Sequence, residues 1–137
     1  MGYSRTLDLS SAYSLSDVLL VSNDDEKNIL NTGTFALAKE IVLIQDVYPI
    51  SSLRVKHDGR DIGGKHLYTQ VFYNGVAVGA IHDSVAGYTT YTDDLAFTNL
   101  MIGDRIQLYA YVDSGVLGFL QNFRIYGTAN PFHANVV

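Results

Sequence analysis

The chain has 137 residues and a formal net charge of -5, with 9 Lys and Arg residues against 14 Asp and Glu residues. A single domain of this length buries about two-thirds of its unfolded surface. The basic residues stand singly, which argues against a nucleic-acid partner, because such partners need a basic stripe that displaces counterions from phosphates. No cysteine is present, so disulfides do not hold the fold.

No apolar run approaches the roughly 18 residues that a membrane-spanning helix needs. The first twenty residues show no basic segment followed by an apolar core, so no secretory signal is visible. The sequence therefore predicts a soluble domain without membrane insertion.

The first half of the chain contains several short apolar segments. Residues 3–9 alternate and are expected to form an edge strand, followed by a Ser-rich spacer at residues 10–16. Residues 18–21 are a short apolar strand. Residues 35–44 contain good helix formers but end in β-branched residues, and their length and context favour a strand buried on both faces.

The second half alternates more clearly. Residues 53–58 read as a strand, and residues 58–64 as the turn that follows it. Asn74-Gly75 then separates two apolar arms, residues 66–73 and 76–81. Asn-Gly is the strongest short hairpin signal, because both central residues of a type I′ turn need positive φ. A long hairpin is therefore expected here.

Three further segments complete the expected sheet. Residues 88–93 form a Thr/Tyr strand, and a turn at Gly103-Asp104 leads into residues 105–112. Residues 116–126 form the last strand. Its core side is expected to carry Phe119, Phe123 and Ile125.

About eight short strands joined by turns predict an all-β fold, a two-sheet antiparallel sandwich of the jelly-roll type. The expected organisation has three parts. Residues 1–16 form an N-terminal arm or edge strand with its spacer, residues 17–127 form the sandwich, and residues 128–137 form an irregular tail.

Four blocks of the sequence resemble a recurring β-sandwich module of phage, prophage and archaeal or bacterial surface proteins, mostly of unassigned function. The blocks are residues 53–56, 71–79, 103–110 and 122–127, and the resemblance covers roughly residues 18–127. It implies a non-enzymatic role in a virion, fibre or cell-surface assembly, and it brings no catalytic residues to transfer.

Titratable residues give no catalytic pattern and suggest no cofactor. His57, Asp58, Asp61 and His66 flank one turn, but their spacing matches no zinc site. Residues 82–84 read His-Asp-Ser, yet consecutive strand residues point to opposite faces and cannot form a triad with one another. The sequence predicts a protein that is not an enzyme.

Two acidic runs are weak calcium candidates, because Ca²⁺ accepts six to eight oxygen ligands in a flexible geometry. Neither run fits the 12-residue calcium loop, and solvated loop acids explain them better. The candidate residues are Asp24, Asp25, Glu26, Asp93 and Asp94.

The polar face of residues 105–112 carries Arg105, Gln107, Tyr109 and Tyr111. Tyr and Arg are favoured at interfaces, so these residues are candidates for a subunit interface. Ordinary cross-strand pairing on a wet sheet face is the alternative. Tyr88 and Tyr91 could instead stack on a sugar, although the absence of Trp makes a carbohydrate platform less favoured.

The N-terminal arm offers a second interface, with Tyr3, Arg5, Leu7 and Leu9 on one face. Such an arm could add to the edge of a neighbouring subunit by β-augmentation, pair with its own sheet, or stay disordered.

The leading expectation is a self-assembling structural protein. It would be a virion component (capsid, decoration or fibre) or an extracellular filament or tube subunit, with itself as partner and a virion or extracellular location. The alternative is a carbohydrate- or receptor-binding module with a glycan or cell surface as partner.

Overall fold

The computed structural model describes residues 3–7, 13–44, 50–62, 64–85, 87–98, 100–113 and 117–129. These residues form strands and no helix, and none of them belongs to a helix long and apolar enough to cross a membrane. The strands are β1 (Tyr3–Leu7), β2 (Tyr13–Asn23), β3 (Lys27–Ile29), β4 (Ala36–Leu43), β5 (Ile50–Ile62), β6 (Leu67–Tyr73), β7 (Val76–Ala77), β8 (His82–Ser84), β9 (Thr89–Thr98), β10 (Arg105–Val112) and β11 (Leu117–Ala129).

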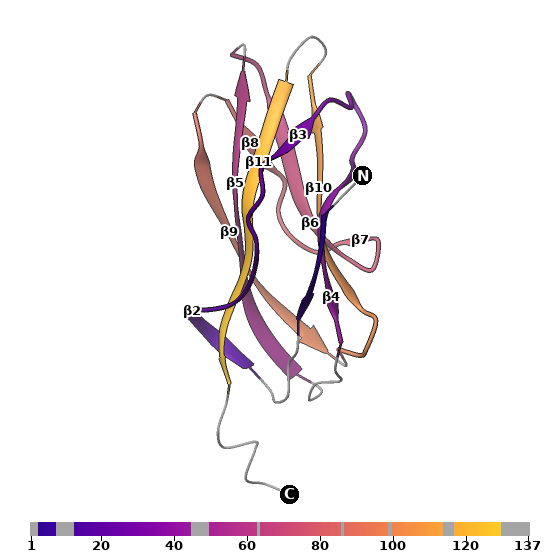
Figure 1. The fold of residues 1–137 in the computed structure, drawn as a ribbon, viewed down its shortest axis with the longest axis vertical. Coiled ribbons are helices and arrows are strands. Elements are labelled where there is room, and N and C mark those ends of the chain that lie inside the picture. The colour runs from indigo at the N-terminus through magenta and orange to yellow at the C-terminus, as the bar shows by residue number, and fades with distance from the viewer. Residues whose placement is uncertain are drawn as a thin grey trace, which may run out of the picture.

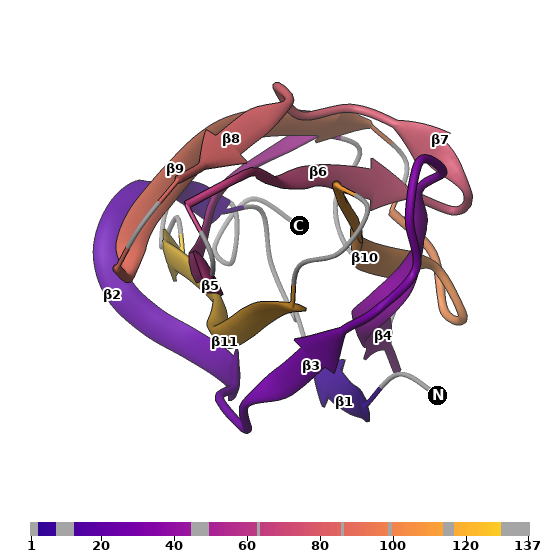
Figure 2. The ribbon, with the colours of Figure 1, turned by 90° about the horizontal axis from the view of Figure 1, so that it is seen from above.

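The strands form two sheets (Figure 1). The first has the order β1-β4-β10-β6-β7, with β8 also paired to β6; the second has the order β2-β11-β5-β9, with β3 beside β11. Every strand pair is antiparallel except β1 and β4. Figure 2 shows the two sheets curving around one common interior. The prediction of an all-β two-sheet sandwich is confirmed.

The core lies between the inner faces of the sheets. Alternate residues of β10 point inward, as predicted, and their side chains are completely buried; they are Ile106, Leu108, Ala110 and Val112. Leu120, Phe123 and Ile125 of β11 join the same core from the other sheet. Removing this apolar surface from water is the main favourable term in folding.

Phe119 corrects one prediction. It is buried, with only 9 % of its surface exposed, but it pairs with Arg60 of β5, whose guanidinium covers its ring at 4.5 Å, and it does not belong to the core cluster. A register shift between Gln121 and Arg124 explains the change, with Asn122 at a φ of 54°. The extra residue of a bulge reverses the inward and outward phase of a strand, so Leu120 takes the core position.

The turn expected at residues 58–64 is also wrong, because β5 continues to Ile62. Gly59 is a strand residue here. A Cβ on Gly59 would lie 3.0 Å from Ser84 Oγ and 3.3 Å from Leu67 Cδ2. Glycine therefore allows the close approach of the facing sheet. In the sequence alone, a glycine with this role cannot be distinguished from a glycine in a turn.

The hairpin at Asn74-Gly75 is confirmed, with φ values of 49° and 82°. Its second arm is shorter than expected, since β7 ends at Ala77. The amides of Val78 and Gly79 both donate to Val71 O, at 3.0 Å each, and this shared acceptor ends the regular ladder.

The N-terminal strand pairs with its own sheet, one of the alternatives left open. β1 runs parallel to β4, from Tyr3 opposite Lys39 to Leu7 opposite Leu43. β2 begins at Tyr13, so the expected spacer is partly strand. The irregular tail expected from residue 128 is wrong for its first two residues, because β11 continues to Ala129 and pairs there with β2. Leu9 and the residues from 130 onward lie outside the described residues. The strand predicted at residues 35–44 is confirmed as β4.

Gly118 provides a test of the packing between the sheets. A Cβ at this position would lie 2.8 Å from Val112 Cγ1 and 2.9 Å from Leu67 Cδ1. Both neighbours are completely buried core side chains. We expect Gly118→Ala to lower the free energy of unfolding by about 1–3 kcal/mol through overpacking, measured by urea denaturation. An unchanged denaturation midpoint would contradict this packing.

Candidate functional site

The outer face of the first sheet carries a row of six aromatic side chains, the aromatic strip. Strand alternation places the even-numbered residues of β6 and the odd-numbered residues of β10 on this face. All six rings are half-buried, so each is packed against its neighbours and still reaches the surface. The aromatic strip consists of Phe35, His66, Tyr68, Phe72, Tyr109 and Tyr111.

Neighbouring rings of the strip contact one another. Phe72 stacks on Tyr109 with 4.0 Å between centroids and 15° between planes. Tyr68 stacks on Tyr111 at 4.8 Å and 30°. Phe35 lies edge-on to Tyr111 at 4.8 Å and reaches Phe72 at 6.1 Å, joining the two pairs. Offset and edge-to-face contacts of this kind stabilise ring pairs beyond their buried area, so the strip is a pre-formed surface.

Two glutamines lie among the rings. Gln70 Nε2 donates to Gly79 O at 2.9 Å, and Gln107 Oε1 accepts from Gly75 N at 2.8 Å. Each bond fixes one end of an amide group. Gln70 Oε1 and Gln107 Nε2 have no hydrogen-bond partner within the described ranges, which leaves one acceptor and one donor beside the strip.

His66 forms the end of the strip, with its ring stacked on Tyr68 at 5.7 Å. Its Nδ1 lies 2.6 Å from Asp83 Oδ1. This hydrogen bond raises the pKa of the His66 imidazole. The aromatic strip therefore ends in an imidazole that is paired with a carboxylate.

The predicted interface residues of β10 do share this face. Tyr109 and Tyr111 belong to the strip, whereas Arg105 forms an ion pair with Glu40 and Gln107 is only 7 % exposed. Of the arm residues, Tyr3, Arg5 and Leu7 lie in β1, where only the backbone is described.

Four members of the strip were missed by sequence reasoning: Phe35, His66, Tyr68 and Phe72. A usable signal exists for two of them, because Tyr68 and Phe72 alternate in the arm of the predicted hairpin. The pairing of β6 with β10, which places Tyr68 opposite Tyr111, is not local in sequence and could not be read from it.

The two tyrosines proposed as a sugar platform do not lie together. Tyr88 is exposed, but the Arg60 guanidinium covers its ring at 5.0 Å and its hydroxyl donates to Glu26 at 2.5 Å. Tyr91 instead stacks on His82 at 4.7 Å, toward the interior. Neither ring is free to form one flat surface with the other.

The candidate calcium ligands are engaged elsewhere. Asp24 binds Arg124 through both oxygens, at 2.8 and 2.9 Å, and this pairing lowers the pKa of Asp24. Asp93 Oδ2 lies 3.0 Å from His82 Nε2. Asp94 is bonded to Arg54, Glu26 accepts from Tyr88, and Asp25 uses its backbone oxygen as an acceptor for Lys39. No cluster of three acidic or histidine side chains suited to a metal occurs among the described residues.

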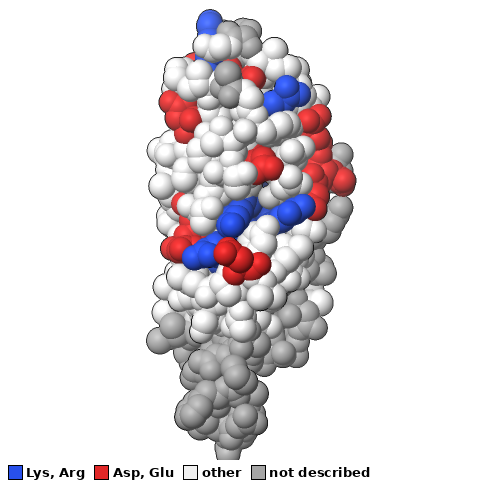
Figure 3. All heavy atoms as spheres, turned by 90° about the vertical axis from the view of Figure 1, so that its left-hand side faces the viewer, with Lys and Arg blue, Asp and Glu red and all other residues white. Residues whose placement is uncertain are grey.

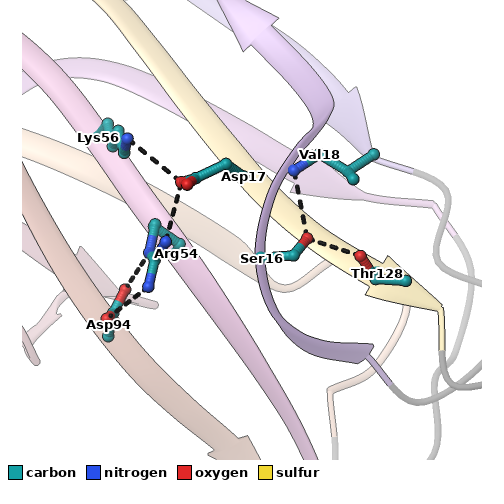
Figure 4. Close-up of polar contacts among 7 residues, drawn as sticks. All are labelled: Ser16, Asp17, Val18, Arg54, Lys56, Asp94 and Thr128. Atoms are coloured by element: carbon teal, nitrogen blue, oxygen red, sulfur yellow. Dashed lines mark hydrogen bonds and ion pairs between the residues drawn. The ribbon is translucent and has the colours of Figure 1, made fainter.

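The outer face of the second sheet carries paired charges (Figure 3). Arg54 binds Asp94 and Asp17 at 2.8 Å each, and Lys56 lies 3.4 Å from Asp17 (Figure 4). The bond from Arg54 lowers the pKa of Asp17. Because its charges are paired with one another, this network presents no concentrated positive field for a phosphate or nucleic acid.

Next to this network, Ser16 of β2 forms a side-chain hydrogen bond to β11. Its Oγ accepts from Val18 N at 3.2 Å and from Thr128 Oγ1 at 2.7 Å (Figure 4).

A buried histidine group lies between the sheets. His57 is completely buried, its Nε2 lies 2.7 Å from Thr69 Oγ1, and its ring centroid lies 5.7 Å from that of His82. Burial lowers the pKa of His57 to about 3, with the nearby His82 adding to the effect. Ser84 Oγ donates to the Tyr91 hydroxyl at 2.9 Å. The serine thus bonds a phenol, which cannot serve as the base of a nucleophilic pair in the way a histidine does.

No protein-family model and no curated sequence matches the chain. Among solved structures, it is similar to the C-terminal domain of EclA, described as a sugar-binding protein. The TM-score is 0.57, with 11 % identity over 82 % of this chain and 82 % of that one. It is also similar to part of the insecticidal delta-endotoxin Cry8Ea1 of Bacillus thuringiensis, with a TM-score of 0.52 and 9 % identity over 76 % of this chain and 20 % of that one. Both likenesses show the fold.

Proposed function

We propose that the chain is a carbohydrate-binding module and that glycans bind along the aromatic strip. The single observation that carries the proposal is the strip itself, a continuous row of half-exposed rings on one sheet face. The fold it shares with a domain described as sugar-binding supports the same function.

The chemistry of the face suits a sugar. A sugar ring has apolar C–H surfaces bordered by hydroxyl groups, so it needs apolar aromatic area with a few polar groups beside it. The tyrosines and Phe35 supply the area. Gln70 Oε1 and Gln107 Nε2 supply an acceptor and a donor for hydroxyl groups. Because the strip is several rings long, it matches an oligosaccharide better than a single sugar.

Self-assembly is the second candidate, and the same face would serve it. Tyrosine-rich faces with arginine at the border are typical of subunit contacts, and Arg105 is half exposed at the edge of this one. A virion component or an extracellular filament subunit would then bury the strip between copies. In either role we place the protein on a virion or outside the cell, where glycans are displayed.

Binding to a glycan array tests the leading proposal. We expect Tyr111→Ala to weaken binding of the array ligands about tenfold or more, because removing a central interface aromatic costs roughly 2 kcal/mol. Tyr126→Ala is the matched control, since Tyr126 is a half-buried tyrosine on the other sheet, under Lys56 at 5.1 Å. Affinities are measured by isothermal titration.

Three results would contradict the proposal. They are an array without a bound glycan, equal affinities for Tyr111→Ala and wild type, and a loss confined to Tyr126→Ala. Light scattering on the same samples tests the second candidate, which predicts oligomers that Tyr111→Ala dissociates.

A further inference from the structure

The charges that act on the His66 end of the aromatic strip are acidic. Asp83 accepts a hydrogen bond from His66, and the charges of Asp113 and Asp61 act on the same imidazole. Desolvation raises the pKa of the neighbouring Tyr68 hydroxyl, and the charges of Asp113 and Asp83 add to the rise. The carboxylates therefore lie close enough to influence the side chains of the strip electrostatically.

The cations beside the strip are already paired. His66 is bonded to Asp83, and Arg105 at the other end of the face forms an ion pair with Glu40. Asp113 is half-buried, and its own amide donates to His66 O at 3.1 Å, which fixes the residue at this end. Because His66 and Arg105 are each matched by a carboxylate, the carboxylate of Asp113 adds a further negative charge at the border of the strip.

We propose that the aromatic strip selects uncharged glycans over acidic ones, with Asp113 as the residue that sets this specificity. The inference rests on the proposed function, because it concerns the same strip. A carboxylate or sulfate on a bound sugar would be repelled by Asp113, and the cations His66 and Arg105 are already engaged by carboxylates of their own. Hydroxyl groups carry no such penalty and can use the two glutamine amides.

Matched glycan pairs that differ only in charge provide the test. Suitable probes are cellohexaose with its 6-carboxylated form, and sialylated N-acetyllactosamine with its carboxylate either free or converted to the neutral amide. At low salt we expect the neutral member of each bound pair to bind at least about fivefold tighter, which corresponds to roughly 1 kcal/mol of repulsion. The difference in affinity between the neutral and the acidic member should become smaller in about 1 M salt, where charges are screened beyond about 3 Å.

Two Asp→Asn variants test whether the preference for neutral glycans comes from Asp113. Asp113→Asn should reduce the preference by at least half, whereas Asp94→Asn, on the outer face of the other sheet beside Arg54, should leave it unchanged. Acidic members that bind as tightly as neutral ones, or a preference that Asp113→Asn does not alter, would overturn the inference while leaving glycan binding intact. If no member of any pair binds, or if Tyr111→Ala binds like wild type, the proposed function fails, and this inference fails with it.

Discussion

Lys39→Met is expected to lower the free energy of unfolding by about 3 kcal/mol or more. Lys39 is completely buried between the sheets, and its Nζ donates to Asn23 O at 3.0 Å, to Asn23 Oδ1 at 3.2 Å and to Asp25 O. Methionine fills nearly the same volume but cannot donate, so it leaves these oxygens without their ammonium partner. Each buried acceptor that loses its partner costs about 1–3 kcal/mol.

Lys56→Met is the matched control for this prediction. Lys56 lies on the outer face of β5, with its Nζ 3.4 Å from Asp17, and such exposed ion pairs contribute at most about 1 kcal/mol. Urea denaturation of both variants measures the difference. Equal losses of stability in the two variants would show that Lys39 does not join the sheets in the way described.

Acidification is expected to destabilise the fold through His57. Its pKa is about 3 in the folded state, where the ring is fully buried, and about 6.5 in an unfolded chain. Below pH 6.5 the unfolded chain takes up a proton that the folded chain refuses. The stabilisation is therefore complete above pH 6.5 and is lost as the pH falls toward 3, at roughly 1.4 kcal/mol per pH unit.

His57→Gln should flatten this dependence, because glutamine can still bond Thr69 but does not titrate. Between pH 7 and pH 5 we expect wild type to lose about 2 kcal/mol more than the variant. His66→Gln is the opposite control. Asp83 raises the pKa of His66, so the stabilisation that this pair provides is present at low pH and is lost as the pH rises through that pKa. Identical pH profiles for wild type and His57→Gln would refute the buried site.

The sequence predicts those parts of the fold that depend on local patterns. The strict alternation of residues 105–112 identifies β10 and its core face, and Asn74-Gly75 identifies the hairpin, since both signals lie within a few residues of each other. Gly59 shows where the same reasoning fails. This glycine permits close packing of its strand against Ser84 and Leu67, which belong to other strands.

The candidate site was less predictable than the fold. Tyr109 and Tyr111 were identified as outward-facing residues, but the strip also needs β6, which β10 contacts across the sheet. Likewise, His57 and His82 belong to different sheets and meet only in the folded protein. Both the aromatic strip and the contact between His57 and His82 depend on the pairing and packing of strands that are distant in the sequence, which a single sequence does not reveal.

Mapping a bound oligosaccharide by NMR shows directly whether glycans bind along the aromatic strip. The ligand is the tightest-binding member of the array, titrated into ¹⁵N- and ¹³C-labelled protein while the aromatic and amide signals are followed. We expect signal shifts at Tyr109, Tyr111, Phe35 and the side-chain amides of Gln70 and Gln107. Shifts that occur instead around Tyr88 and Arg54 on the opposite sheet, with the signals of the strip unmoved, would contradict glycan binding along the strip.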